Sequence, residues 1–275
     1  MPVDVVFVRH GRSEGNEARE QSKRGDERHY TPEFRSRRNR EWRLTEAGIQ
    51  QAQAAGAWIA ANVTETFFRY VTSEYLRARE TAAHLDLAAA RWTQDILLRE
   101  RSWGHADFVM PESERFERFA AELAARREDP CYWRPPDGES LAEVCLRVER
   151  VVERLRRECA GQRCVVVTHE DVMWAARFVL EGLTQERWRE MLLSADPYDK
   201  IHNGQVLHYT RRDPETGELG ARLQWVRSVC PWDPARSRDA WQHVEAPSFS
   251  NNELLASVAE VKRLVAGEPL DFQGL

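Results

Sequence analysis

The sequence predicts an α/β fold, a three-layer sandwich in which helices cover both faces of a mostly parallel central sheet. Three observations favour it. Short apolar runs rich in valine recur along the chain, as in "VDVVFVR" and "CVVVTHE". A stretch with the helical periodicity of apolar residues follows each of these runs. Strands that alternate with helices of about 10–18 residues are typical of a parallel sheet that is buried on both faces.

The first part of the chain contains two strand–helix units. The run Val3–Val8 carries apolar residues at both parities, which predicts a strand buried on both faces. The stretch 44–61, "LTEAGIQQAQAAGAWIAA", predicts a helix whose N-cap is Thr45. The second unit consists of a strand at 67–73 and a helix at 74–90.

The middle of the chain continues the alternation of strands and helices. Ser140 and Glu143 form a capping-box pattern, which predicts that a helix begins there. In chain order we expect a short strand near Ile96–Leu98, a helix at 112–127, a helix from Ser140 to about Cys159, a strand at 164–170 and a helix at 171–181.

The C-terminal part of the sequence has a different pattern. Residues 205–211 and 221–228 predict a β-hairpin around the turn "DPETGE". A tryptophan-rich coil follows, and then a helix at 251–265. We therefore expect a domain at 1–211 with insertions near 17–43 and 104–138, and a C-terminal extension at 212–275 packed on that domain.

Composition and charge exclude several classes of protein. With 42% hydrophobic and 31% charged residues among 275, the chain can bury the core of one large domain. Its formal net charge of −5 argues against nucleic acid or a membrane as partner. No run approaches the roughly 18 apolar residues of a spanning helix, and we see no signal peptide. The five cysteines include no C-x-x-C pair, so we expect reduced thiols in a cytoplasmic protein. The oligomeric state is left open.

Two histidines follow valine-rich strands at equivalent positions. Arg9 and His10 end the first strand, and His169 ends a later one. Ligands of parallel α/β sheets bind at the carboxyl ends of strands, beside helix N-termini that favour anions, so we expect both imidazoles to converge on one phosphate pocket. Arg77 offers a guanidinium at a third junction, and such groups bind phosphate oxygens in a bidentate manner. The alternative is that each histidine is only a hydrogen-bonded residue at a strand end.

Six motifs occur along the chain in a fixed order, beginning with "VRHGRSEGN". The others are "LTEAGIQQA", "TSEYLRARETA", "LRERSWG", "PPDGES" and "VVVTHEDV". Together they resemble the motifs of the histidine phosphatase superfamily, which includes the cofactor-dependent phosphoglycerate mutases. The resemblance covers about residues 3–211 and implies a phosphoglycerate mutase-like fold.

The resemblance implies catalytic roles for five residues. His10 would be the nucleophile that takes the phosphoryl group as a phosphohistidine. Glu100 matches the proton donor to the leaving oxygen, and a nearby phosphate dianion would raise the pKa of this carboxyl. Arg9, Arg77 and His169 would hold the phosphate oxygens and stabilise the transferring group, so that no metal and no cofactor is expected.

Three more residues are expected to contact the phosphate or the substrate. The resemblance implies that Asn16 and Ser13 hydrogen-bond the phosphate from the turn and helix start after the first strand. Glu170 departs from the glycine that many family members have after the second histidine. Its carboxylate either points outward or contacts the non-phosphate half of a substrate, which leaves the substrate open.

The insertions and the tail have two interpretations each. "FRSRRNREWR" (34–43) is either an anion-attracting rim over the pocket or a solvated or oligomer-facing segment. Tyr132 and Trp133 either line the substrate site or pack in the core. The tryptophan-rich segment 230–241 is either an interaction surface or packs back on the domain.

Three functions remain. The sequence favours a metal-independent phosphomonoesterase that hydrolyses small phosphorylated metabolites. The second is a phosphoglycerate mutase-like phosphotransferase. Glycolytic mutases usually continue the acidic motif into a glycine-rich stretch with a lysine, whereas "ERSWGHADFVMPESE" has no lysine. The third is a non-enzymatic regulatory or binding member of the family, against which the retention of the whole catalytic set argues.

Overall fold

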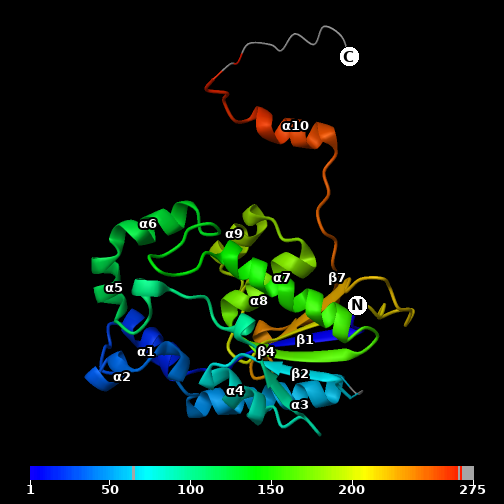
Figure 1. Cartoon of the computed structure of the whole chain (residues 1–275), viewed down its shortest axis with the longest axis horizontal. Helices are drawn as coiled ribbons and strands as arrows, with labels where there is room; N and C mark the ends of the chain where they lie inside the picture. The colour runs from blue at the N-terminus through cyan, green and yellow to red at the C-terminus, as the bar shows by residue number, and fades with distance from the viewer. Residues whose placement is uncertain (64–65, 266, 268–275) are drawn as a thin grey trace. The chain divides into compact units, whose positions relative to one another are not determined.

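A seven-stranded sheet forms the centre of the molecule (Figure 1). The computed structural model describes residues 1–63, 66–265 and 267. Residues 1–245 form one compact unit, and Ala246 begins a second one. The sheet order is β3-β2-β4-β1-β5-β6-β7. The strands are β1 (Asp4–Arg9), β2 (Arg69–Thr72), β3 (Trp92–Gln94), β4 (Arg163–Thr168), β5 (Val206–Thr210), β6 (Trp225–Val229) and β7 (Arg238–His243).

The sheet is mixed, with a parallel half and an antiparallel half. β3, β2, β4 and β1 pair in parallel, as the alternation of strands and helices predicts. β5, β6 and β7 pair antiparallel from β1 outward, because direct connections without crossover helices join these three strands. The predicted α/β class is confirmed. The expected mostly parallel arrangement holds for the half that contains β1 and β4.

Helices cover both faces of this sheet (Figure 1). One apolar core joins Val5 and Phe7 of β1 to the helices α7 and α8, and a second joins Val6 and Val8 to α3 and α4. The apolar residues at both parities of β1 are thus buried on both sides, as predicted. The helices are α1 (Glu14–Lys23), α2 (Pro32–Ser36), α3 (Glu46–Asn62), α4 (Leu76–His84), α5 (Glu112–Arg118), α6 (Ala120–Glu128), α7 (Leu141–Glu158), α8 (Glu170–Glu181), α9 (Gln185–Leu193) and α10 (Asn251–Ala259).

The prediction of a strand near Ile96–Leu98 is wrong. These residues form a 3₁₀ helix, and the strand β3 lies just before them. The side chain of Asp95 accepts a hydrogen bond of 2.9 Å from the backbone N–H of Leu97, and this turn ends the strand. Ile96 is 62% exposed, so the apolar run does not mark a buried strand.

Two predicted helices are shorter than expected, and a third is divided. The helix expected at 74–90 ends at His84, before Asp86 and Ala89 adopt positive φ values of 47° and 56°. The helix expected at 112–127 is two helices, α5 and α6, separated at Phe119. The terminal helix expected at 251–265 ends at Ala259. The capping box of Ser140 and the N-cap of Thr45 are both present as predicted.

Residues 212–245, expected as an extension, contribute two strands to the same sheet. The predicted hairpin is confirmed in the pairing of β5 with β6. The strand β7 follows where only coil was expected. It lies at the edge of the sheet with both faces partly exposed, so its sequence lacks the apolar alternation of a buried strand. The helix α9 was also not expected.

The two insertions pack against each other. The first extends α1 and adds α2, and the second forms α5 and α6. Arg19 of α1 forms an ion pair of 2.8 Å with Glu112 of α5, and Arg35 of α2 forms one of 2.8 Å with Glu114. The contact between α1 and α5 therefore joins segments that are far apart in the sequence, since 93 positions separate Arg19 from Glu112.

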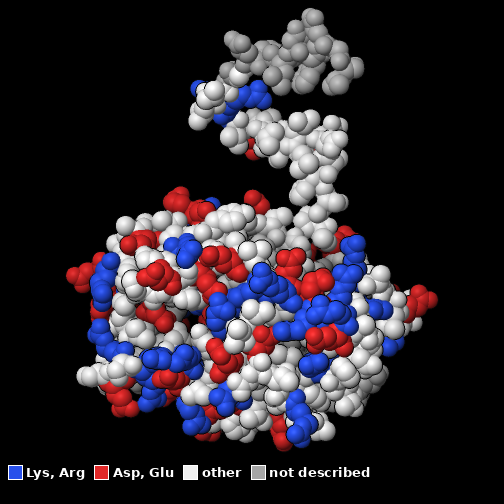
Figure 2. All heavy atoms as spheres, in the orientation of Figure 1, with Lys and Arg blue, Asp and Glu red and all other residues white. Residues whose placement is uncertain are grey.

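The charge distribution on the surface and the state of the cysteines agree with the expectations from composition. Figure 2 shows Lys and Arg side chains interspersed with Asp and Glu on the face in view. All five cysteines are free thiols, as expected. Among the described residues, none of the helices combines the length and the apolar content needed to cross a bilayer.

Two glycines allow the loop after β1 to touch the start of α3. A Cβ on Gly11 would lie 2.1 Å from the carbonyl oxygen of Gly48, and one on Gly48 would lie 2.1 Å from that of Arg12. Thr45 donates a backbone hydrogen bond of 2.9 Å to the same carbonyl of Arg12. The motifs "RHGRS" and "LTEAG" thus share one close backbone contact directly beside His10.

We expect Gly48→Ala to destabilise the protein by about 1–3 kcal/mol, because the methyl group overlaps backbone that cannot move without shifting the loop. Chemical denaturation measures the change. Gly220→Ala is the matched control, since its Cβ would meet only the flexible side chain of Gln224. Equal denaturation midpoints for the two variants would contradict this account of the contact.

Candidate active site

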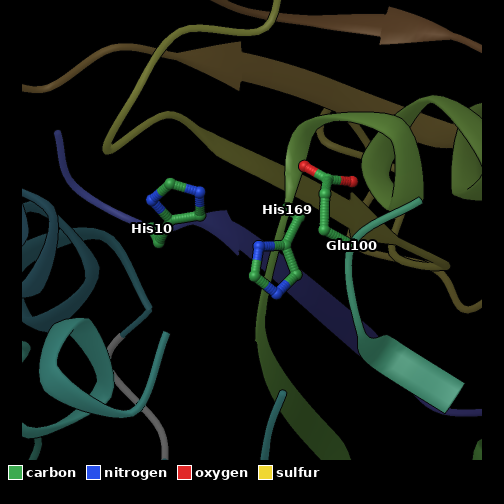
Figure 3. A group of neighbouring side chains, drawn as sticks. All are labelled: His10, Glu100 and His169. Atoms are coloured by element: carbon green, nitrogen blue, oxygen red, sulfur yellow. The ribbon is translucent and has the colours of Figure 1, made fainter. Parts of the chain in front are cut away.

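The two predicted histidines lie side by side (Figure 3). Their ring centroids are 5.1 Å apart with an interplanar angle of 64°. His10 follows β1 and His169 follows β4, and these strands are parallel neighbours with Arg9 opposite Thr168. Both rings are buried. The expected convergence of the two imidazoles at the carboxyl edge of the sheet is therefore observed.

The hydrogen bonds of His10 define its tautomer. Nδ1 lies 2.7 Å from the carbonyl oxygen of Gly11, which can only accept, so Nδ1 carries the proton. Nε2 accepts a hydrogen bond of 3.1 Å from Nε of Arg77. Burial, followed by the positive charges of Arg77 and Arg9, holds the pKa of His10 well below its ordinary value. His10 is thus a neutral imidazole whose Nε2 carries the lone pair.

His169 is equally buried and neutral. Its Nε2 lies 2.8 Å from the hydroxyl of Ser73, and its Nδ1 is buried with no hydrogen-bond partner among the described residues. Burial, and then the charge of Arg77, holds the pKa of His169 well below the ordinary value. His169 is also the N-cap residue of α8, so it stands where the positive end of a helix dipole meets the site.

Two buried guanidinium groups flank the rings. Arg9 donates to the carbonyl of Ile201 at 2.5 Å and pairs with Glu170 at 2.7 Å, while its Nε has no partner in the described structure. Arg77 donates from Nη1 to the carbonyl of Asn39 at 2.8 Å, in addition to its bond with His10. These contacts hold both guanidinium groups beside the two imidazoles.

Glu100 completes the group drawn in Figure 3. Ligand atoms of Glu100, His10 and His169 all lie within 4.8 Å of one another. Burial raises the pKa of Glu100 to about 7, and repulsion from Asp171 adds to the effect, whereas Arg77 opposes it. The pKa of Asp171 is raised by burial as well. A carboxyl in this position holds a proton near neutral pH, which suits a general acid.

These three residues also have the geometry of a metal site, but the surroundings favour an anion. Nε2 of His10 already accepts the bond from Arg77. Two guanidinium groups border the cluster, and their charges oppose a cation and attract an anion. Guanidinium groups are suited to bind the oxygens of a phosphate.

Ser13 and Asn16 line the pocket and cap α1. The Oγ of Ser13 accepts a bond of 3.3 Å from the backbone of Asn16, and Oδ1 of Asn16 accepts one of 3.2 Å from the backbone of Ser13. Asn203, which the sequence analysis did not single out, donates to the same Oδ1 at 3.0 Å and to the carbonyl of His10 at 3.1 Å. These three side chains form one network beside His10.

The pocket around these residues has a volume of about 720 Å³. Cations outnumber anions in its wall. Its charged residues are Arg9, Arg12, Arg19, Lys23, Arg24, Arg77, Arg126, Lys200 and Arg236 against Glu20, Glu100, Glu170 and Asp171. Glu170 thus faces the pocket, where its carboxylate pairs with Arg9, rather than pointing away.

Other candidates from the insertions lie elsewhere. None of the five arginines at 34–43 lines the pocket, although Asn39 and Trp42 do. Tyr132 and Trp133 do not line it either. The tail does reach the pocket, through Trp232 and Arg236. Sequence reasoning left the orientation of this tail open because no pattern within it pointed to the site.

Comparison with known proteins agrees with the motifs. The sequence model of the histidine phosphatase superfamily (branch 1) matches residues 5–197. The chain belongs to this superfamily. It is 31% identical over 187 residues to a 2,3-bisphosphoglycerate-dependent phosphoglycerate mutase of Methylobacterium radiotolerans, covering 66% of this chain and 80% of the relative. It is also 31% identical over 130 residues to the 6-phosphofructo-2-kinase/fructose-2,6-bisphosphatase of Gallus gallus, covering 47% of this chain and 26% of the relative.

Solved structures share the fold of this superfamily member. A mycobacterial glucosyl-3-phosphoglycerate phosphatase aligns with a TM-score of 0.58 at 22% identity, covering 75% of this chain and 92% of that one. The α-ribazole phosphatase of Shigella flexneri aligns with a TM-score of 0.58 at 19% identity, covering 80% and 95%. The predicted phosphoglycerate mutase-like architecture is confirmed by these likenesses.

We expect the stability of the protein to fall as pH rises from about 4.5 towards about 7, because the folded state holds a proton on Glu100 that the unfolded state has lost. Glu100→Gln removes this dependence. Relative to the native protein, the variant should gain about 1–3 kcal/mol of unfolding free energy at pH 8 and little at pH 4. Urea denaturation at both pH values measures it, with the exposed Glu215→Gln as control. A difference that is the same at both pH values would contradict the raised pKa.

Proposed function

We propose that this chain is a metal-independent phosphomonoesterase that works through a phosphohistidine on Nε2 of His10. One observation carries the proposal. A neutral, buried His10 lies beside a carboxyl whose pKa is raised to about 7, with one ring nitrogen of His10 and one carboxyl oxygen of Glu100 within 4.8 Å of each other. One site thus offers a nucleophile and a proton donor. The guanidinium groups beside them would neutralise the charge of a phosphate.

In the first step, Arg77 shifts its Nε–H from Nε2 of His10 to a phosphoryl oxygen, Nε2 attacks phosphorus, and the bond to the ester oxygen breaks. Arg9, Arg77 and His169 hold the three phosphoryl oxygens as charge develops on them. The proton on Nδ1 of His10 stays bonded to the carbonyl of Gly11, which stabilises the phosphohistidine tautomer. Glu100 gives its proton to the leaving oxygen, and an alcohol departs.

In the second step, water attacks the phosphohistidine and the P–N bond breaks. Glu100, now a carboxylate, takes a proton from this water. Inorganic phosphate leaves, and Nε2 of His10 recovers its lone pair. The arginines and His169 act in the same way in both steps, since the same three oxygens carry the charge.

Hydrolysis is favoured over transfer to a second substrate. A mutase must keep water from its phosphohistidine, whereas Glu170, which pairs with Arg9 at the phosphate position, has a side chain that is 42% exposed. The segment after Glu100 also lacks the lysine usual in glycolytic mutases. The identity to named mutases makes phosphotransfer the second candidate.

We expect His10→Ala to lower the turnover of p-nitrophenyl phosphate by about 10³-fold or more, because the variant lacks the imidazole on which the covalent intermediate forms. The assay contains EDTA and compares the native protein, His10→Ala and the exposed-histidine control His29→Ala. Acid-labile, base-stable labelling by ³²P-substrate should accompany activity. Unchanged activity of His10→Ala, or none in the native protein, would refute the proposal.

A second measurement separates hydrolase from mutase. With 3-phosphoglycerate and a bisphosphate primer, we expect phosphate release, if this ester is accepted, to exceed formation of 2-phosphoglycerate. ³¹P spectroscopy follows both products in one sample. Efficient isomerisation with negligible phosphate release would make phosphotransfer the function of this site.

A further inference from the structure

Trp232 has the most exposed ring among the tryptophan and phenylalanine side chains that line the pocket. It belongs to the loop between β6 and β7, which lies outside residues 5–197 that match the superfamily. The pocket is also lined by Trp42 and Trp103, but these are only 3% and 6% exposed, whereas Trp232 is 37% exposed. Trp232 is thus the most exposed of the three tryptophans that line the pocket, while Phe108, which also lines it, is half-buried under the guanidinium of Arg19.

Trp232 is held rigidly next to the reacting histidine. Its Nε1 donates a hydrogen bond of 2.7 Å to the backbone carbonyl of Asn203. The side chain of Asn203 in turn donates to the carbonyl of His10 at 3.1 Å. The loop itself is closed by a bond of 2.9 Å from the N–H of Cys230 to the hydroxyl of Ser237. The polar atom of the indole is therefore satisfied, and what remains exposed is the apolar ring.

The surroundings of Trp232 do not favour a second phosphate. Arg236 lies over the indole at 5.3 Å, but Asp233 pairs with its guanidinium at 2.8 Å. Glu170 also faces the pocket, where it pairs with Arg9. Two carboxylates thus offset the charges of Arg236 and Arg9, and the ammonium of Lys200 donates to the backbone carbonyls of Met191 and Leu192.

We propose that Trp232 determines specificity for the leaving group, by stacking on an aromatic ring of the substrate. This inference rests on the proposed function, since it describes the ester that this site would cleave. The class of substrate is an aryl or heteroaryl phosphomonoester, whose phosphate reaches His10 while its ring covers the indole. Stacked aromatic pairs gain energy beyond the area they bury, and a preformed ring loses little freedom on binding.

Binding of non-hydrolysable phosphonates tests the proposal without any turnover. Calorimetry compares naphthylmethylphosphonate, in which CH₂ replaces the ester oxygen, with ethylphosphonate. We expect the naphthyl compound to bind the native protein about ten-fold more tightly or better. Trp232→Ala should abolish most of this preference and leave the affinity for ethylphosphonate within about two-fold. The two proposals are tested separately. A protein without phosphatase activity would refute the proposed function, whereas the binding of the two phosphonates can be compared in either case.

Trp232→Phe separates stacking from positioning. Phenylalanine keeps a ring but loses the bond to Asn203. We expect this variant to retain most of the naphthyl preference. If Trp232 acts only through Asn203 on His10, both variants should weaken the two phosphonates equally, and that result would overturn the proposal. So would equal affinities of the two phosphonates for the native protein. Thermal unfolding of each variant, with Trp241→Phe as control, establishes that the fold is intact.

Discussion

The parallel pairing of β1 with β4 is the constraint on which the site depends. Arg9 lies opposite Thr168 in this register, and the backbone N–H of His10 extends the ladder by a bond of 2.9 Å to the carbonyl of Thr168. The two histidines therefore leave the sheet at the same height from neighbouring strands. A slip of one residue would send one ring to the opposite face, so the buried valines that fix the register also fix the distance between the imidazoles.

Charge balance follows from this arrangement. Burial, together with the charges of the guanidinium groups, keeps both imidazoles neutral, and the guanidinium groups also leave the site short of negative charge until an anion binds. Glu170 supplies part of that charge through its pair with Arg9, while burial keeps Glu100 from supplying the rest. A phosphate dianion would relieve this imbalance. The positive charges thus lower the pKa of both imidazoles and favour an anion in the pocket, whereas burial, opposed by Arg77, retains the proton on Glu100.

Sequence reasoning found the residues whose position follows from local pattern. His10 and His169 stand at the ends of valine-rich strands, so their meeting could be predicted from the alternation of strands and helices. Asn203 and Asp171 could not be found in this way, because the first reaches His10 only through a loop and the pKa of the second is raised by burial in the folded protein. The strand β7 was missed because an exposed edge carries no apolar alternation.

The groups that we propose for the chemistry and those that we propose for selectivity come from different parts of the chain. The groups suited to phosphoryl transfer stand on the sheet edge and the start of α4, whereas the walls of the pocket come from α1, the insertion that contains α6, and the loop after β6. Asn203 connects these parts, since its side chain bonds His10 and Asn16 while its carbonyl holds Trp232. A change in the loop after β6 can therefore alter the shape offered to a leaving group while the strand register keeps the two imidazoles in place.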